Sequence, residues 1–125
     1  MPEKKFKHKE VTEQILNAAF EVHNILGCGF LEKVYENSLV YELKQRGLKV
    51  ETQKEIKVVY KKTEVGLYIA DVVVEDKVIV ELKTVEEINS IHQAQLLNYL
   101  KSSGYEVGLI LNFAKTRLEY KRMVI

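Results

Sequence analysis

The sequence contains very little cysteine and proline. Among 125 residues there is one cysteine, Cys28, and one proline. A lone cysteine excludes an internal disulfide and a Cys/His zinc site. No Gly/Ser-rich or repetitive tract indicates a linker or a repeat array. No apolar run approaches the roughly 20 residues of a membrane-spanning helix, and the charged start lacks a signal-peptide pattern. We therefore expect a cytoplasmic protein without a membrane segment.

The sequence also lacks a strong charge of one sign. Its 19 basic and 18 acidic residues nearly cancel, so the net charge does not indicate a nucleic-acid-binding protein and any site for a polyanion must be local. One local surplus opens the chain, at Lys4, Lys5, Lys7 and Lys9. With 46% hydrophobic residues the chain can bury one core. We expect a single domain over residues 1–125, in which residues 1–10 form a flexible basic N-terminus.

The hydrophobic periodicity predicts three helices and six strands. A helical period runs through the first third of the chain, and Val- and Ile-rich strands separated by polar breaks follow. Ser90 and Gln93 resemble a capping box for a third helix that ends before Gly104. This order predicts a mixed α/β (α+β) fold. The helices are expected at Thr12–Leu26, Leu31–Gln45 and from Ser90, and the strands at Leu48–Glu51, Ile56–Tyr60, Gly66–Val74, Val78–Lys83, Val107–Leu111 and Leu118–Val124.

One predicted hairpin carries charged residues among apolar ones. If residues 75–77 form its loop, Val74 pairs with Val78 and Asp71 lies opposite Glu81. Alternation then predicts two faces, and both look buried. One face would hold Ile69, Asp71, Val73, Ile79, Glu81 and Lys83, and the other Ala70, Val72, Val74, Val78, Val80 and Leu82. A one-residue slip, or a plain ion pair between Asp71 and Lys83, is the structural alternative.

Two opposed carboxylates in a buried hairpin need a positive charge between them, because like charges directly opposite destabilise a sheet. Lys83, two residues after Glu81, supplies one such charge. A divalent cation held by Asp71 and Glu81 would supply the rest. Ligands that are all oxygen favour Mg²⁺ or Mn²⁺ over zinc.

Three motifs in this order resemble those of a known family. Asp71 followed by Glu81-Leu82-Lys83 resembles the signature of the PD-(D/E)XK nuclease superfamily, with Ala70 in place of the proline. Residues 29–35 match the Gly-x-x-Glu-x-x-Tyr motif of its GxxExxY family, through Gly29, Glu32 and Tyr35. Gln95 and Tyr99 match the Gln-x-x-x-Tyr motif of the exonuclease-like branch. The resemblance extends from about residue 15 to residue 124.

The resemblance implies a restriction-endonuclease-like core, in which a central mixed β-sheet is flanked by helices. It also implies a metal-dependent nuclease that hydrolyses phosphodiester bonds in DNA or RNA. Asp71, Glu81, Glu32 and the backbone carbonyl of Leu82 would hold Mg²⁺ or Mn²⁺, and Lys83 would orient water or stabilise the transition state. The alternative is a catalytically weak or inactive nuclease-fold module that binds nucleic acid or a protein partner. A homodimer or a partner protein would then complete the substrate groove.

Helical spacing places further residues of these motifs near each other. Glu32 and Tyr35 are three residues apart, and Gln95 and Tyr99 four apart, so the members of each pair share a helix face. We expect Glu32 to be a third carboxylate of the centre, and Gln95 and Tyr99 to contact a phosphate or support the acidic cluster. Tyr35 lies in an apolar stripe and is expected in the core. His92 fits both a helix-start surface and the rim of the site.

Overall fold

The computed structural model describes residues 7–125, and its centre is one five-stranded mixed sheet. The strands lie in the order β1-β2-β3-β4-β5, and only β3 and β4 run parallel. The predicted mixed α/β fold is therefore confirmed. In chain order the elements are α2 (Lys9–Leu26), α3 (Glu32–Gln45), β1 (Val50–Tyr60), β2 (Thr63–Val74), β3 (Val78–Lys83), α4 (Ser90–Ser103), β4 (Val107–Asn112) and β5 (Glu119–Val124).

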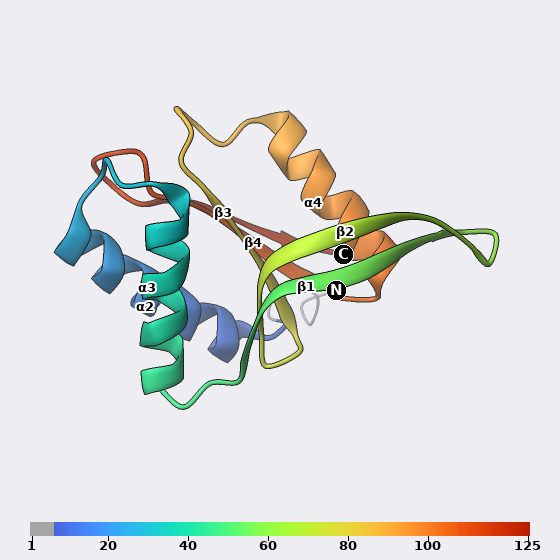
Figure 1. Ribbon diagram of the computed structural model, residues 1–125, viewed down its shortest axis with the longest axis horizontal. Coiled ribbons are helices and arrows are strands. Elements are labelled where there is room, and N and C mark those ends of the chain that lie inside the picture. The colour runs from blue at the N-terminus through green and yellow to red at the C-terminus, as the bar shows by residue number, and fades with distance from the viewer. Residues whose placement is uncertain (1–6) are drawn as a thin grey trace.

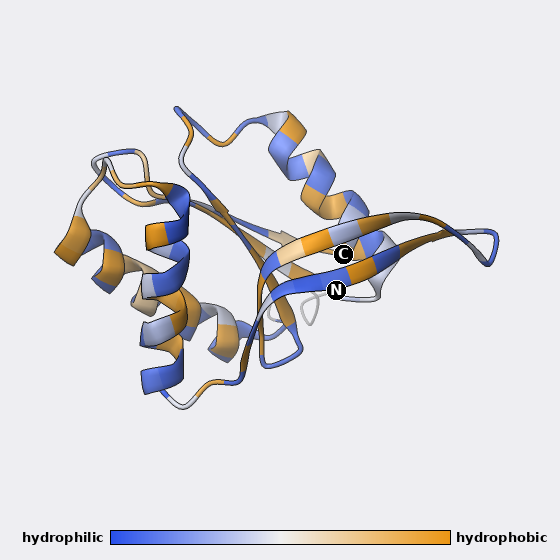
Figure 2. Ribbon diagram, viewed as in Figure 1, coloured by the Kyte–Doolittle hydropathy of each residue, from blue (hydrophilic) through white to orange (hydrophobic). Residues whose placement is uncertain are grey.

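The helices cover the two faces of the sheet. Figure 1 shows α2 and α3 together on one side and α4 on the other. Each side has its own core. Tyr35, Leu39 and Phe113 belong to the core under α2 and α3, whereas Leu96 and Ile110 belong to the core under α4. The two cores explain why β3 and β4 read as nearly continuous apolar runs, which are visible as orange ribbon in Figure 2.

Tyr35 holds the corner between α2 and α3. Its side chain is fully buried and stacks on Phe113, with 4.6 Å between the ring centroids. Its hydroxyl donates to the carbonyl of Gly27 at 2.6 Å and accepts from the N–H of Phe30 at 3.2 Å. The expected core position of Tyr35 is thus observed. The tyrosine of the Gly-x-x-Glu-x-x-Tyr motif fixes the loop before α3, and thereby the place where that helix starts.

The strand prediction was wrong about both strands of the ribbon, and β2 begins at Thr63, three residues before the predicted Gly66. Residues 48–51 and 56–60 were expected as separate strands, but Val50–Tyr60 forms the single strand β1. The polar residues between them, such as Thr52 and Glu55, suggested a break. They are exposed on a two-stranded ribbon whose surface faces water, so polar side chains do not interrupt the strand.

The predicted cap of α4 was also wrong, by one residue. The N-cap is Asn89, whose side chain accepts from the N–H of His92 at 2.9 Å. In return, the His92 ring accepts from the N–H of Asn89 at 3.2 Å. Ser90 and Gln93 therefore do not form the capping box. The predicted left-handed glycine after the helix is correct, since Gly104 has φ 85°.

The start of the chain is described only in part. Helix α2 begins at Lys9, three residues before the predicted Thr12, and so includes two residues that were assigned to the basic N-terminus. Lys7 forms an ion pair with Glu106. Lys4 and Lys5 lie outside the described residues. Within residues 7–125, no helix is long and apolar enough to span a membrane.

Candidate nuclease centre

The hairpin of β2 and β3 has the predicted register. Val74 pairs with Val78 and Val72 with Val80, and the same register places Asp71 opposite Glu81. The backbone pairing ends at Val72, and one carboxylate oxygen of Asp71 instead accepts from the N–H of Leu82 at 3.0 Å. The acid thus replaces a backbone partner at the point where the two strands separate.

The predicted faces are correct only beyond Asp71. Val72 packs under α2 and α3 and Val73 under α4, as expected. Ala70 was expected on the same face as Val72, but it packs under α4. Ile69, expected to be buried, is 39% exposed. The alternation therefore reverses between Ala70 and Val72, and that part of the prediction was wrong.

The reversal coincides with a strained residue on the neighbouring strand. The β1–β2 register places Gln53 opposite Asp71, between the pairs formed by Thr52 and Lys54. Gln53 has φ 49°, in the left-handed region that side chains other than glycine rarely adopt. Both strands change faces at this point, since Val50 contacts the core under α2 and α3, and Ile56 the core under α4. Such strain is commonly found at functional sites.

Glu81 has a buried oxygen without a partner. Among residues 7–125, its Oε1 atom has no hydrogen-bond donor although it is shielded from solvent. Burial raises the pKa of Glu81 to about 7, and the charges of Glu32 and Glu36 act in the same direction, whereas Lys83 opposes them. Removal from water disfavours the charged carboxylate. A positively charged partner would therefore stabilise the charged form of this carboxylate.

Glu32 lies within electrostatic reach of both Glu81 and Asp71. Burial raises the pKa of Asp71, and the N–H of Leu82 and the charge of Lys83 lower it in part. Partial burial also raises the pKa of Glu32, the first residue of α3, and the charge of Asp71 raises it further. Lys83 lowers the pKa of all three carboxyl groups. Glu32 and Lys83 thus act on both Asp71 and Glu81, and the hairpin register places those two acids opposite each other.

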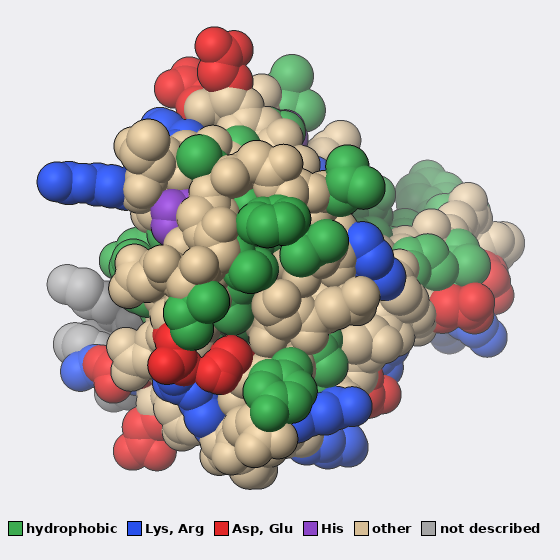
Figure 3. All heavy atoms as spheres, turned by 60° about the vertical axis from the view of Figure 1, so that its left-hand side comes forward, with side chains coloured by type: hydrophobic (Ala, Val, Ile, Leu, Met, Phe, Trp, Pro, Cys, Tyr) green, Lys and Arg blue, Asp and Glu red, His purple; other side chains and the backbone are tan. Residues whose placement is uncertain are grey.

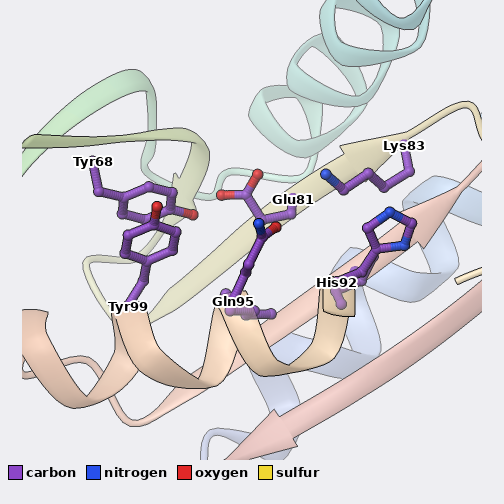
Figure 4. Close-up of a pocket in the computed structure, with 8 residues that line it drawn as sticks. Tyr68, Glu81, Lys83, His92, Gln95 and Tyr99 are labelled. Atoms are coloured by element: carbon purple, nitrogen blue, oxygen red, sulfur yellow. The ribbon is translucent and has the colours of Figure 1, made fainter. Parts of the chain in front are cut away.

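Helix α4 closes the other side of the centre. Gln95, Tyr99 and His92 line a cavity of about 140 Å³ together with Glu81 and Lys83. Figure 4 shows the Gln95 side chain directed toward the Glu81 carboxylate, and the His92 ring beside Lys83. His92 therefore combines both expected roles, because it caps the helix and borders the cavity.

A stacked tyrosine pair lines this cavity. Tyr68 from β2 and Tyr99 from α4 stack with 3.7 Å between ring centroids and 4° between ring planes. The Tyr68 hydroxyl is buried without a hydrogen-bond partner in the described part of the chain, and Figure 4 shows it on the side of Glu81. Tyr68 was not predicted as a site residue. Its sequence position gave no signal, because it reaches the cavity only through the reversal at Asp71.

Glu36 and Gln53 were also missed. Glu36 is only 5% exposed and forms an ion pair with Lys33, with 2.7 Å between Nζ and Oε2. The side-chain amide of Gln53 donates to both oxygens of Glu36, at 3.1 and 3.2 Å. Glu36 follows Glu32 by four residues, so helical spacing would have placed both acids on one face. Nothing in the sequence marked Gln53.

A buried amide holds the loop that leads into α4. Asn112 is fully buried, and its side chain both donates to and accepts from the backbone of Val85, at 2.9 and 3.1 Å. It also donates to Glu119 at 2.9 Å, and Glu119 accepts from the N–H of Ile88. These bonds connect the loop after Lys83 to β4 and β5. They fix α4, and with it Gln95 and Tyr99, relative to the hairpin.

The residues at the centre match the preferences of a hard divalent cation. Mg²⁺ and Mn²⁺ prefer oxygen ligands, and the unpartnered Oε1 of Glu81 is an oxygen of that kind with the charge of Glu32 acting on it. Within residues 7–125, no three Asp, Glu, His or Cys side chains are arranged as a group that could hold a metal ion.

Comparisons with known proteins identify relatives of this chain. A family model described as the PD-(D/E)XK nuclease superfamily matches residues 9–123. No curated protein matches the sequence. Among solved structures, the protein SSO0001 is similar over 74% of this chain, with 20% identity and a TM-score of 0.55. The chain spans 48% of the length of SSO0001, which is about half. An alkaline exonuclease (LHK-Exo) from Laribacter hongkongensis gives a TM-score of 0.49 and 10% identity over 90% of this chain and 81% of its own.

Proposed function

This chain belongs to the PD-(D/E)XK nuclease superfamily, and we propose that it is an Mg²⁺- or Mn²⁺-dependent nuclease centred on Asp71, Glu81 and Lys83. Members of this superfamily generally use divalent metal ions and act on nucleic acids. We further propose that the chain is a member of the GxxExxY family, because Glu32 lies at the centre and Tyr35 holds the corner before it. A cytoplasmic location is part of this proposal, supported by the single, exposed Cys28.

The observation that carries the proposal is the unpartnered oxygen of Glu81. A buried carboxylate without a donor is costly, and it is rare unless a function requires it. The charged groups that act on Glu81 are two more acids, Glu32 and Glu36, and one lysine, Lys83. A divalent cation removes this repulsion, whereas a purely structural role would favour replacing one of the acids. We therefore assign Asp71, Glu81, Glu32 and the carbonyl of Leu82 as its ligands.

The side chains around the ion have distinct tasks in phosphodiester hydrolysis. When bound, the divalent ion activates a water and screens charge on the phosphate. Lys83 lies on the same face as Glu81 and positions that water or meets the charge developing on phosphorus. The water oxygen bonds to phosphorus, the ester P–O bond breaks, and a proton goes to the leaving oxygen. Gln95 and Tyr99 support Glu81 from α4.

A second candidate function is an interaction module that binds a protein or nucleic acid without cleavage. The observation that favours it is an apolar groove between α2 and α3, lined by Val22, Leu26 and the exposed Ile25 and Tyr41. Figure 3 shows hydrophobic side chains gathered on this side of the molecule. Such surfaces mark sites of association. A homodimer or a protein partner that binds here is compatible with nuclease activity as well.

Metal titration tests the proposed nuclease function directly. Mg²⁺ or Mn²⁺ should raise the melting temperature of the wild type, because an ion at a hundred times its Kd stabilises by about 2.7 kcal/mol. Glu81→Gln should abolish this rise, whereas the matched change Glu87→Gln at an exposed loop position should keep it. Labelled single-stranded, duplex and branched DNA and RNA then test cleavage.

Two results would contradict the assignment. An equal metal-induced rise in Glu81→Gln would place the ion elsewhere. Metal-free binding of a substrate that the wild type never cleaves would favour the interaction module.

A further inference from the structure

Strands β1 and β2 continue as a two-stranded ribbon beyond the sheet. Strand β2 pairs with β3 only from Val72 to Val74, but it pairs with β1 all the way to the turn at Tyr60 and Thr63. Figure 1 shows the outer part of this ribbon, residues 57–67, reaching past the rest of the molecule, whereas Ile56, Tyr68 and Ala70 at its base are buried under α4. From Asp71 to Thr63 the eight residue steps span roughly 27 Å. The ribbon therefore starts at the proposed nuclease centre and extends away from it.

The tip of the ribbon is built from residues that the turn does not favour. Lys61 and Lys62 form a two-residue loop with φ 48° and 67°, the geometry that favours Asn-Gly. Three other left-handed residues make polar side-chain contacts: Gln53 with Glu36, Glu75 with the N–H of Lys49, and Asp76 with Lys54 and Tyr105.

The two lysines have no such explanation. The ammonium of Lys61 lies 5.4 Å from the ring centroid of its neighbour Tyr60, and Lys62 has no polar partner among residues 7–125. The fold alone therefore gives no reason for two lysines in this turn.

The surface of the outer ribbon combines positive charge with exposed apolar side chains. Residues 57–67 hold three lysines and one glutamate, a net charge of +2, whereas the whole chain has +1. Lys57 has a side chain that is 72% exposed. Leu67 and Ile69, two residues apart on one ribbon face, are 52% and 39% exposed, and Val65, where the β1–β2 register shifts, is 59% exposed. This composition suits contact with phosphates at the edges and with base edges at the centre.

We propose that this ribbon binds the DNA duplex on which the proposed nuclease acts, and this inference rests on the proposed function. The major groove of B-form DNA admits a two-stranded ribbon, whereas the deep and narrow major groove of A-form RNA does not. The lysines of the tip contact phosphates, and the apolar face meets base edges, including thymine methyl groups. The protruding part, four residue steps from Leu67 to Thr63, covers about four base pairs, and its base leads toward Asp71.

The test measures binding of the full chain to duplex DNA without metal, so that cleavage plays no part. The decisive variant is Lys61→Asn with Lys62→Gly, which gives the turn its favoured residues and removes two charges. The control is Lys44→Gln with Lys49→Gln, an equal charge change at exposed positions away from the tip. Leu67→Thr tests the apolar face. Duplex RNA and single-stranded DNA serve as comparison ligands.

The turn variant should be more stable and bind DNA less well. Its melting temperature should rise by roughly 3 to 6 °C, because the left-handed strain is relieved. The variant loses two phosphate contacts, and at about 0.1 M salt each contact contributes a factor of about 10 to the power 0.9 to the affinity. The affinity for duplex DNA should therefore fall roughly 60-fold. The slope of log K against log salt should decrease by about 2. Leu67→Thr should weaken binding while that slope stays the same, and the control should lose much less affinity than the turn variant.

Several results would overturn the proposal. These are unchanged DNA affinity in the turn variant, equal loss in the control, or tighter binding of duplex RNA than of duplex DNA by the wild type. If Leu67→Thr dissolves a dimer and leaves DNA affinity unchanged, the ribbon is a contact between two copies of the chain. If the wild type cleaves DNA and the turn variant cleaves it equally well, the proposed role of the ribbon is rejected and the nuclease function stands. Metal-free duplex binding that depends on the ribbon, without any cleavage, would reject the nuclease function but keep the ribbon.

Discussion

The metal-free protein should lose stability as pH rises from about 4.5 to 7, and Glu81 should be the main cause. Burial raises the pKa of this carboxyl group from 4.5 to about 7 in the folded state. A carboxyl whose folded pKa is raised contributes stability that is fully present below the unfolded pKa and lost as pH rises through the folded pKa. At about 1.4 kcal/mol for each unit of pKa, the free energy of unfolding should fall by about 3 kcal/mol across this range.

Other acids do not cancel this effect. Burial also raises the pKa of Asp71 and of Glu32, so both act in the same direction. Hydrogen bonding to Tyr105 and Lys54 lowers the pKa of Asp76, and its contribution is lost only as pH falls below the ordinary range of an aspartate. The two effects therefore occupy separate pH ranges.

Urea unfolding in EDTA, at pH values between about 4 and 8, measures the slope. Glu81→Gln should remove most of it, so that this variant matches the wild type near the acid end and exceeds its stability by about 3 kcal/mol near pH 8. Glu87→Gln, at an exposed position, should keep the wild-type slope. Mg²⁺ should restore stability mainly above pH 7, where the carboxylates are charged. A wild-type stability that is flat or rises over this range would refute the buried-carboxylate argument.

Two further predictions concern single residues of the centre. Lys83→Ala should reduce the cleavage rate at least about a hundredfold while it retains the Mg²⁺-induced rise in melting temperature, because an ammonium is no metal ligand; loss of that rise would contradict this role, and Lys83→Arg should rescue the rate poorly. Gln53→Gly and Gln53→Ala both remove the amide that contacts Glu36, so a comparison of the two variants isolates the backbone strain. The glycine variant should be about 1 kcal/mol more stable than the alanine variant because Gln53 has φ 49°; equal stabilities in urea would contradict the strain.

The hairpin could be predicted from the sequence because the length of its loop and the Val-rich runs on either side give the same register. Three polar residues, 75–77, stand between two Val-rich runs, and a loop of that length pairs Val74 with Val78. The same register brings Asp71 opposite Glu81, so the central acids were predictable from the residue pattern of the hairpin. Helices α2 and α3 were predictable for a similar reason, since their apolar stripes and the left-handed Gly47 agree on their ends.

Glu36 and the cap of α4 were missed because contacts with other residues decide both. Glu36 is a charged side chain that can be buried because Lys33 forms an ion pair with it and Gln53 donates hydrogen bonds to it. The burial of an acid has no local signal in one sequence. The cap of α4 was placed on Ser90 because Ser and Asn are nearly equal as N-caps. The His92 ring accepts from the N–H of Asn89, and this reciprocal hydrogen bond makes Asn89, not Ser90, the N-cap.

The reversal at Gln53 and Asp71 is the feature that joins the two halves of the centre. With uninterrupted alternation, Tyr68 and Ala70 would lie with Val72 under α2 and α3. Because the ribbon changes faces, Tyr68 lies under α4 and stacks on Tyr99, while Val72 remains in the other core. Asp71 stands at the change itself, where its carboxylate accepts from the N–H of Leu82 in place of a backbone partner.

A left-handed residue in a strand costs about 1 to 2 kcal/mol, which burial of one aromatic ring offsets. The reversal at Gln53 and Asp71 therefore brings Tyr68 into the core under α4, where it stacks on Tyr99 at the cavity that Glu81 and Lys83 also line. With uninterrupted alternation the sheet would keep its strand order but the Tyr68–Tyr99 pair would be lost.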